Sequence, residues 1–329
     1  MANMHEYRDL DRQLTHALQI NGRMSLSRVA EVLGVSGQTV ARRYARLRSH
    51  GALRVIGLTN PLLLGELVWL TRVRCTPDAA KAVADALARR HDTSWVQLTS
   101  GGTDVMCVVR TREPSDGDSL LLQQLPRTPR VLDVTAHCVL HVFTSGAHGV
   151  LDNTDILSAE QVRQLQPPPP TGSPLDLTDG DHRLMAALHQ DGRAPLADLA
   201  KVTQWSQTTV RRRMAALQDA GVLYFDVDFD RALLGLRYQA LLWLSVPPAQ
   251  LHQVGGQLAE HPEVAYVAAT TGPTNLVASV VCSNVTELYA YITRRIAVLP
   301  AVTHLETAPV LRTIKTAVTL GLPYHSAAH

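Results

Sequence analysis

Residues 36–47 read SGQTVARRYARL, and residues 206–217 read SQTTVRRRMAAL. The two stretches belong to a longer internal repeat: residues 11–65 align with residues 181–235 without insertion, and 21 of the 55 positions are identical. Two copies of a helix that carries paired arginines are what a two-headed DNA-binding protein needs, because duplex DNA offers equivalent half-sites about one helical turn apart. The sequence therefore predicts a pseudo-dimer written in one polypeptide.

Hydrophobic spacing within the repeat predicts three short helices followed by a strand. In the third helix, Val40, Tyr44 and Leu47 recur at helical spacing and should face the core, and Ser36 should cap the start of this helix. A tight turn precedes the helix and an apolar stretch over residues 53–58 follows it. This order is typical of a winged helix-turn-helix.

The charge pattern favours DNA contact by both third helices. No acidic residue lies between Glu31 and Glu66 or between Asp198 and Asp219, although the net charge of the chain is only +2. Local basic patches are the electrostatic footprint of DNA binding. One arginine-rich helix is more often just a solvated face, but two equivalent copies favour a function. The predicted DNA-binding residues are Ser36, Gln38, Thr39, Arg42, Arg43, Arg46, Arg54, Ser206, Thr208, Thr209, Arg211, Arg212 and Arg213.

These residues are expected to contact different parts of the DNA, some the phosphates and others the base edges. Ser36 and Ser206 should bring the helix N-termini to phosphate groups. Gln38, Thr39 and Arg42, like Thr208, Thr209 and Arg212, should reach base edges, whereas Arg43, Arg46, Arg211 and Arg213 are better placed for phosphates. The second copy lacks counterparts of Arg46, Arg48 and Arg54 and carries Asp226, Asp228 and Asp230 along its wing, so it is expected to bind DNA more weakly.

A different pattern follows each winged module. Alternating apolar stretches and two helical stretches predict a βαββαβ unit, the ferredoxin-like arrangement, in both halves. The fold class is therefore α+β: two copies of a winged helix-turn-helix, each followed by a ferredoxin-like domain. The two open sheets should pack against each other, within one chain or between two chains. The predicted helices and strands of this part lie at residues 66–75, 78–90, 94–100, 104–110, 115–125 and 131–143, and at 237–246, 248–260, 264–270, 275–282, 284–297 and 302–314.

A proline-rich stretch separates the two copies. Four consecutive prolines at 167–170 favour an extended spacer, and residues 158–165 before them read as a short capped helix. The predicted domains are 1–60, 66–146, a linker at 147–175, 176–232 and 236–322.

Composition narrows the class of protein. The chain has 329 residues, of which 46% are hydrophobic and 5% aromatic, so several small aliphatic cores are expected. The four cysteines show no CxxC spacing and predict buried free thiols rather than disulfides or metal ligands. No signal peptide and no apolar run of roughly 20 residues is seen, which predicts a cytoplasmic protein without a membrane partner. We expect no cofactor and no metal.

The motifs resemble those of the Lrp/AsnC family of prokaryotic transcriptional regulators. The resemblance lies in Asp11, in NGR at 21–23 and DGR at 191–193, in the two stretches quoted first, in Gly65 and Gly235, and in a G-x-x-D turn at 101–104. It covers nearly the whole chain apart from the linker and the ends. Family members usually carry one copy, so this chain resembles a tandem fusion.

The resemblance implies partners as well as a fold. It implies a sequence-specific regulator that binds double-stranded DNA, responds to a small effector such as an amino acid, and forms a homodimer of the doubled chain. The effector would bind near the G-x-x-D turn, where glycines let backbone N–H groups approach a carboxylate and Asp104 could take an ammonium. The expected effector residues are Gly101, Gly102, Thr103 and Asp104, with Thr271, Gly272 and Asn275 in the second copy.

An enzyme is the main alternative, because siroheme decarboxylases resemble this family and can occur as two fused copies. The fourteen histidines are scattered without shared placement in the two copies, and no RRFGA-type stretch occurs. We therefore predict a regulator with no catalytic residues, and not an enzyme. A third alternative, an effector-binding protein that has lost DNA binding, is disfavoured by the paired arginines in both copies.

Overall fold

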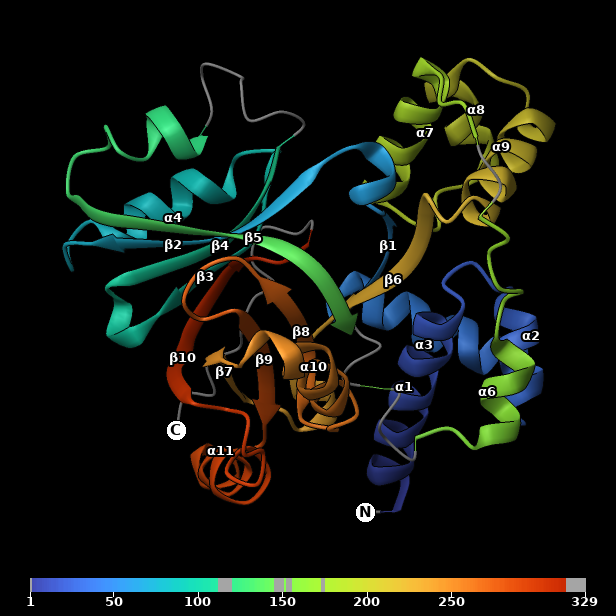
Figure 1. Ribbon diagram of the computed structural model, residues 1–329. Helices are drawn as coiled ribbons and strands as arrows, with labels where there is room; N and C mark the ends of the chain where they lie inside the picture. The colour runs from blue at the N-terminus through green and yellow to red at the C-terminus, as the bar shows by residue number, and fades with distance from the viewer. Residues whose placement is uncertain (1, 112–119, 145–150, 152–155, 173–174, 318–329) are drawn as a thin grey trace. The chain divides into compact units, whose positions relative to one another are not determined.

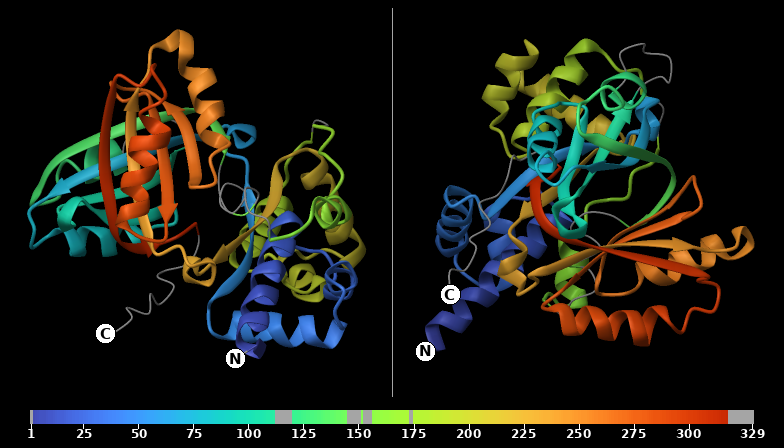
Figure 2. Two further views of the ribbon diagram at one scale, coloured as in Figure 1. Left: turned by 90° about the horizontal axis from the view of Figure 1, so that it is seen from below. Right: turned by 90° about the vertical axis from the view of Figure 1, so that its left-hand side faces the viewer.

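A computed structural model describes residues 2–111, 120–144, 151, 156–172 and 175–317 of the chain (Figures 1 and 2). It divides into two compact units. Unit 1 comprises Met1–Gly65 and Thr154–Leu233, and unit 2 comprises Glu66–Asn153 and Leu234–His329. Each unit thus contains one kind of module from both copies of the repeat. The ranges of the four domains and the linker drawn from the sequence stay a prediction.

Unit 1 contains both helix-turn-helix modules. The first has α1 (Ala2–Ile20), α2 (Leu26–Leu33), α3 (Gly37–Ser49), β1 (Leu53–Thr59) and the short η1 (Leu62–Leu64). The second has α7 (Asp179–Gln190), α8 (Leu196–Thr203), α9 (Gln207–Asp219), β6 (Leu223–Phe229) and η4 (Arg231–Leu234). The buried side chains of α3 include Val40, Tyr44 and Leu47, as their spacing predicts.

The two modules share a two-stranded sheet. β1 and β6 pair antiparallel from Leu53↔Phe229 to Thr59↔Leu223. Ile56 pairs with Asp226, which is its own counterpart in the repeat, so a pseudo-two-fold axis passes through this pair. Each strand therefore joins the other copy, and the wings that the sequence predicts are the two halves of one ribbon.

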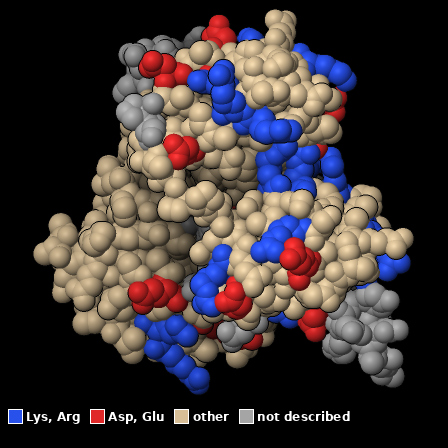
Figure 3. Space-filling model, turned by 90° about the vertical axis from the view of Figure 1, so that its right-hand side faces the viewer, with Lys and Arg blue, Asp and Glu red and all other residues tan. Residues whose placement is uncertain are grey.

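The segment between the copies also connects the two modules. The predicted short helix exists as α6 (Ala159–Leu165), which begins with a capping box of Ser158 and Gln161. The Gln161 amide donates to the Val32 carbonyl of the first module. Beyond the prolines, Thr171 donates to the Asp219 carboxylate at the end of α9. Figure 3 shows Lys and Arg side chains in the upper and central parts of one face, with Asp and Glu side chains scattered among them.

Unit 2 contains both ferredoxin-like modules. The first has β2 (Leu67–Cys75), α4 (Ala80–Ala88), β3 (Thr93–Thr99), η2 (Ser100–Gly102), β4 (Asp104–Thr111), η3 (Leu120–Gln124) and β5 (Val131–Thr144). The second has β7 (Tyr238–Ser245), η5 (Pro248–Gln250), α10 (Leu251–Ala259), β8 (Val264–Thr270), β9 (Leu276–Cys282), α11 (Val285–Tyr291), η6 (Ile292–Ile296) and β10 (His304–Lys315). The predicted helix at 115–125 lies partly outside the described residues.

The two sheets close into one barrel of eight strands in the order β10-β3-β4-β2-β5-β8-β9-β7. The last strand of each module makes this closure. β5 pairs with β2 and then, from Val139, with β8 of the other module. β10 likewise pairs with β7 and then, from Val310, with β3. The described structure therefore answers the question left open by the sequence: the two ferredoxin-like units pair within one chain.

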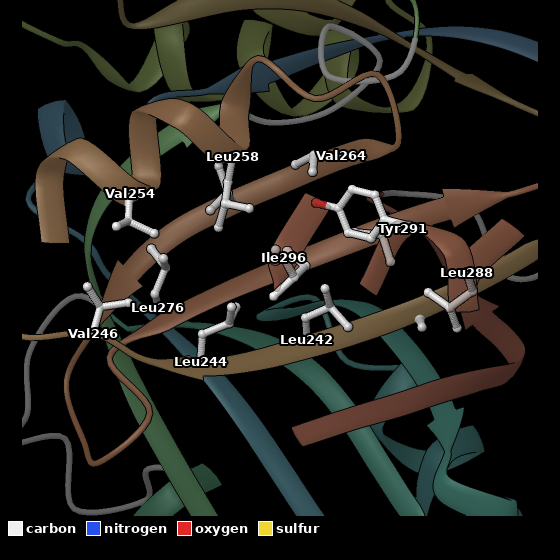
Figure 4. Close-up of a cluster of buried hydrophobic side chains, with 14 of the residues drawn as sticks. Leu242, Leu244, Val246, Val254, Leu258, Val264, Leu276, Leu288, Tyr291 and Ile296 are labelled. Carbon is white, nitrogen blue, oxygen red and sulfur yellow. The ribbon is translucent and has the colours of Figure 1, made fainter. Parts of the chain in front are cut away.

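Aliphatic side chains form the cores of unit 2. In the second module, Val254 and Leu258 of α10 point toward the strands that carry Leu244 and Leu276 (Figure 4). A separate cluster that includes Leu70, Met106, Leu241 and Trp243 is contributed by strands of both modules and joins the two sheets. All four cysteines are free, and three of them are buried.

Candidate nucleic-acid interface

The third helices of both modules begin in the same way. Ser36 Oγ accepts a hydrogen bond from Thr39 N at 3.1 Å, and Ser206 Oγ accepts one from Thr209 N at 3.1 Å. The two hydroxyls of each Ser–Thr pair also lie within 3.0 Å of each other. Both serines are therefore N-caps, as predicted, and these polar groups define the first turn of α3 and of α9.

One face of each helix is left to solvent. Gln38 and Arg42 are exposed on α3, and Thr208, Arg211 and Arg212 are exposed on α9. Val210, Met214 and Leu217 face the core of the second module, as Val40, Tyr44 and Leu47 do in the first. The exposed side chains are hydrogen-bond donors and acceptors of the kinds that read base edges in a major groove.

The structure corrects the role predicted for Arg43. Its side chain is only 5% exposed and lies 3.7 Å from Oδ2 of Asp11, which is also buried. Arg46 donates to the same oxygen at 2.9 Å, although much of its side chain is exposed. Burial raises the pKa of Asp11, and the attraction of Arg43 and Arg46 offsets only part of that effect. Arg43 thus stabilises the interior of the module and is not available to a phosphate.

The second copy repeats this arrangement. Arg213 donates to both carboxylate oxygens of Asp181, at 2.8 and 2.5 Å. Burial raises the pKa of Asp181, but the hydrogen bonds from Arg213 and Thr178 outweigh burial and the net shift is downward. Arg213, whose side chain is 21% exposed, is thus bound to a carboxylate within its own module, which argues against the predicted phosphate contact. The identical Asp and Arg positions in both copies were the signal that could have revealed this pair.

The acidic wing predicted for the second copy is also corrected. Asp226 and Asp228 are 5% and 7% exposed, because β6 is paired with β1. Arg54 is exposed and occupies the position opposite Asp228 in the ribbon. Asp226 and Asp228 therefore do not form a solvent-facing acidic edge, which removes one of the two reasons for expecting a weaker second head; the missing counterparts of Arg46, Arg48 and Arg54 remain the other.

One arginine from each module binds backbone carbonyls of the other module, and the sequence analysis did not predict this contact. Arg23 Nη1 donates to the Gly192 carbonyl at 2.7 Å, and Arg193 Nη1 donates to the Gly22 and Met24 carbonyls at 2.6 and 2.9 Å. We call these two side chains the arginine clasp. Burial lowers the pKa of both clasp arginines. The NGR and DGR motifs therefore connect the copies.

Glycines allow the clasp to form. A Cβ on Gly22 would lie 2.7 Å from Val55 Cγ1, and a Cβ on Gly192 would lie 2.9 Å from the backbone of Ile56. Gly192 N also donates to the Val55 carbonyl at 2.8 Å. The close approach of these loops to the ribbon leaves no room for a side chain, so both motifs need glycine at the second position.

The predicted effector turn of the first copy has its expected backbone but not its expected chemistry. Gly101 and Gly102 have φ values of 77° and 86°, which favour glycine. Thr103 donates to the Ser100 carbonyl within the turn. Asp104 is 3% exposed; its Oδ2 accepts a hydrogen bond from Arg72 Nε at 2.9 Å and lies 2.7 Å from Arg72 Nη2 in an ion pair. The idea that this carboxylate takes an ammonium is therefore wrong.

Arg72 also links the two modules of unit 2, since its Nη1 lies 2.7 Å from Oε1 of Glu306. Burial lowers the pKa of Arg72, but the hydrogen bonds to Asp104 and Glu306 outweigh burial and the net shift is upward. The three side chains form an ion network between β2, β4 and β10, and Arg74 Nε also lies 3.8 Å from Asp104 Oδ1.

The corresponding turn of the second copy is built differently. Thr271 accepts from Cys138 N at 2.9 Å, and His137 Nδ1 lies 2.7 Å from the Thr271 carbonyl. A Cβ on Gly272, whose φ is +102°, would lie 2.5 Å from that ring nitrogen. Asn275 exchanges hydrogen bonds with the backbone of Val246. The first predicted turn therefore bonds to its own backbone, whereas the second bonds to β5 of the other module.

A tryptophan lies next to the second turn. The ring centroids of Trp243 and His137 are 5.1 Å apart. The Trp243 side chain is 2% exposed, and its Nε1 finds no hydrogen-bond partner among the described residues.

No cluster of three metal-ligating side chains occurs in the described part of the chain. No described helix is long and apolar enough to cross a membrane.

Family models match both halves of the chain. The AsnC-type helix-turn-helix domain matches residues 9–48 and 177–218, and the Lrp/AsnC ligand binding domain matches residues 68–147 and 239–320. The HTH-type transcriptional regulator FL11 of Pyrococcus horikoshii is 31% identical over 143 residues, which are 43% of this chain and 93% of that protein. The regulator AldR of Mycolicibacterium smegmatis is 39% identical over 72 residues, 22% of this chain and 42% of that protein.

A solved structure corrects one expectation. The siroheme decarboxylase NirDL covers 95% of this chain and 93% of its own, with a TM-score of 0.65 at 15% sequence identity. An enzyme thus has the same tandem fold over nearly the whole length of this chain. The prediction from the sequence that an enzyme could be excluded was therefore wrong.

The sequence relatives, in contrast, are regulators, and the two FL11 proteins each align with 43% of this chain. Because both family domains occur twice in one polypeptide, the chain belongs to the Lrp/AsnC family of transcriptional regulators and is a tandem form of it.

Proposed function

We propose that the chain binds double-stranded DNA in a sequence-specific way, with α3 and α9 acting as one reading unit. The observation that carries the proposal is the pseudo-two-fold joint formed by the β1–β6 ribbon and the arginine clasp. A two-fold pair of recognition helices matches the symmetry of duplex DNA, in which half-sites recur about one turn apart. Here a single polypeptide supplies both helices.

The exposed faces provide the reading residues of this proposal. Gln38 and Arg42 on α3, and Thr208, Arg211 and Arg212 on α9, are assigned to base edges and neighbouring phosphates. The capped first turns, with Ser36, Thr39, Ser206 and Thr209, bring helix N-termini to phosphates. Arg54 and Arg46 add cationic charge beside α3.

Unit 2 is proposed to take the effector, in line with its match to a ligand binding domain. Asp104 is committed to Arg72, so the groups left for a small molecule such as an amino acid are backbone N–H groups of the glycine turns. Gly101, Gly102, Thr103, Thr271 and Gly272 supply these turns. Asn275 supports its turn through Val246 and is assigned no direct contact.

The test is fluorescence anisotropy with the full chain and a labelled duplex from the region upstream of its own gene. We expect saturable binding that resists excess nonspecific DNA. Arg42→Ala and Arg212→Ala should each cost about 1–3 kcal/mol of binding free energy, the usual range for a base contact. Arg163→Ala on α6, where the arginine is exposed, is the matched control and should bind as wild type. Unchanged affinity in both variants would contradict the assignment.

Siroheme decarboxylation is the second candidate function, because NirDL shares the full tandem fold and has been solved with an iron-uroporphyrin III analogue. A carboxylated tetrapyrrole needs cationic and hydrogen-bonding groups. In this chain, Arg72 and His137 are candidates, but Arg72 is already bound to two carboxylates. Incubation with siroheme, followed by mass spectrometry for loss of carbon dioxide, tests this candidate; an unchanged tetrapyrrole would rule it out.

A further inference from the structure

We infer that the two reading helices recognise different half-sites, so that the operator of this chain is an imperfect inverted repeat bound in one orientation. The inference rests on the proposed DNA binding and adds the sequence class of the target. It follows from comparing α3 and α9 position by position on their exposed faces.

The scaffold beneath the two helices is nearly the same. Both begin with a Ser cap bonded to a Thr, both bury apolar side chains at three matching positions, and both pair an Arg with a buried Asp, although Arg43 is buried and Arg213 is 21% exposed. The ribbon relates the two modules by pseudo-two-fold symmetry. The helices are therefore presented in equivalent ways, and any difference in reading must come from the exposed side chains.

Those side chains differ at three positions of the first two turns. Gly37, Gln38 and Ala41 of α3 correspond to Gln207, Thr208 and Arg211 of α9, and all six are exposed. Arg42 and Arg212 are shared. No ion pair among the described residues engages Arg42, Arg211 or Arg212, so all three guanidinium groups are available to DNA.

On the helices themselves, the number of arginines without an ion pair is the reverse of the expected charge balance, although the exposed Arg54 on β1 still adds a cation to the first module. The additional arginines of α3 are committed within unit 1, since Arg46 bonds to Asp11 and Arg48 bonds to Asp191. On its exposed reading face, α9 carries two uncommitted arginines where α3 carries one. Trp205, which precedes α9, packs against Gly180 rather than projecting as a reading side chain.

These differences translate into base preference. Arginine reads guanine through O6 and N7, glutamine reads adenine through N6 and N7, and a small apolar side chain accommodates a thymine methyl. Arg211 should therefore add a G·C preference to the half-site of α9. Gln38 and Ala41 should favour A·T at the equivalent positions in the half-site of α3. A single chain always carries one of each helix, so the operator should combine one half-site of each kind.

The test is selection of bound duplexes from a random library with the full chain. The symmetrised variant Gly37→Gln, Gln38→Thr, Ala41→Arg gives α3 the exposed face of α9, and a Cβ at Gly37 meets no atom within 4 Å. Wild type should enrich a site with two different halves and prefer it by about tenfold over the palindrome of the α9 half. The variant should enrich that palindrome. Ser49→Arg adds one charge at the far end of α3 and should select the wild-type site.

The outcomes separate the two proposals. A palindromic site selected by wild type, or a Ser49→Arg variant that shifts selection as the symmetrised variant does, would overturn the unequal half-sites. If none of the three proteins enriches any sequence, the proposed DNA binding itself fails and the inference falls with it.

Discussion

The arginine clasp should contribute measurably to the joint between the two modules. Arg193→Ala removes the hydrogen bonds to the Gly22 and Met24 carbonyls, which are 2.6 and 2.9 Å long, and a cation–π contact with Tyr44 at 5.4 Å. A hydrogen bond with a charged donor contributes about 1.5–3 kcal/mol net. Arg193 is half-buried, so we take the lower part of that range for each bond and expect a loss of about 3 kcal/mol.

The assay is hydrogen exchange of the full chain, read on peptides that contain residues 53–59 and 223–229. These amides form the β1–β6 ribbon, and a weaker joint should let them open more often. The expected loss corresponds to roughly a hundredfold faster exchange in the regime where opening is at equilibrium. Arg163→Ala, which removes only an exposed ion pair on α6, should change exchange of these peptides by less than about threefold. Ribbon exchange within that small range for Arg193→Ala would refute the reasoning.

Further predictions concern the joint, the acid stability and the assembly. Gly192→Ala should destabilise unit 1 by about 2 kcal/mol, the cost of overpacking, because its Cβ would lie 2.9 Å from the Ile56 backbone; urea unfolding monitored by ribbon exchange measures it. The pKa of Asp181 is lowered in the fold, so its contribution to stability is present above the unfolded pKa of about 3.9 and is lost as the pH falls through the lower folded value. Asp181→Asn should therefore flatten the acid limb of the stability profile and cost about 3 kcal/mol at neutral pH, and an unaltered profile would contradict this. The doubled chain should form a homodimer, with twice the mass of one chain by light scattering at micromolar concentration; a monomeric mass would disprove it.

Much of the fold could be predicted because it depends on short-range patterns. The 3.6-residue period of Val40, Tyr44 and Leu47 places α3 against its core, and alternation along the sheet segments gives the strands. The direct repeat gives the tandem plan. The barrel closes because β5 and β10 are long enough to pair with strands of both modules. The length of these two predicted strands is the feature of the sequence that indicates closure. Which edge each strand then joins is a long-range choice that no local pattern encodes.

The site was harder to predict. The helical pattern shows on which face of a helix an arginine lies, but it does not show which carboxylate or carbonyl the arginine binds. Arg43 was assigned to phosphate, yet its carboxylate partner is Asp11, which lies 32 residues earlier and is buried with it. Arg23 and Arg193 bond to backbone carbonyls of the opposite module, a contact that only the assembled ribbon creates. Asp104 likewise meets Arg72 only after two strands pair.

The central claim is that one chain reads DNA with two joined heads, and a footprint of the upstream duplex tests it most directly. We predict two protected half-sites about 10 base pairs apart, centre to centre. Because the clasp and ribbon join the heads, Arg42→Ala and Arg212→Ala should each weaken protection over both half-sites together. Loss of only one half-site in each variant, or the absence of any footprint for wild type, would contradict the account.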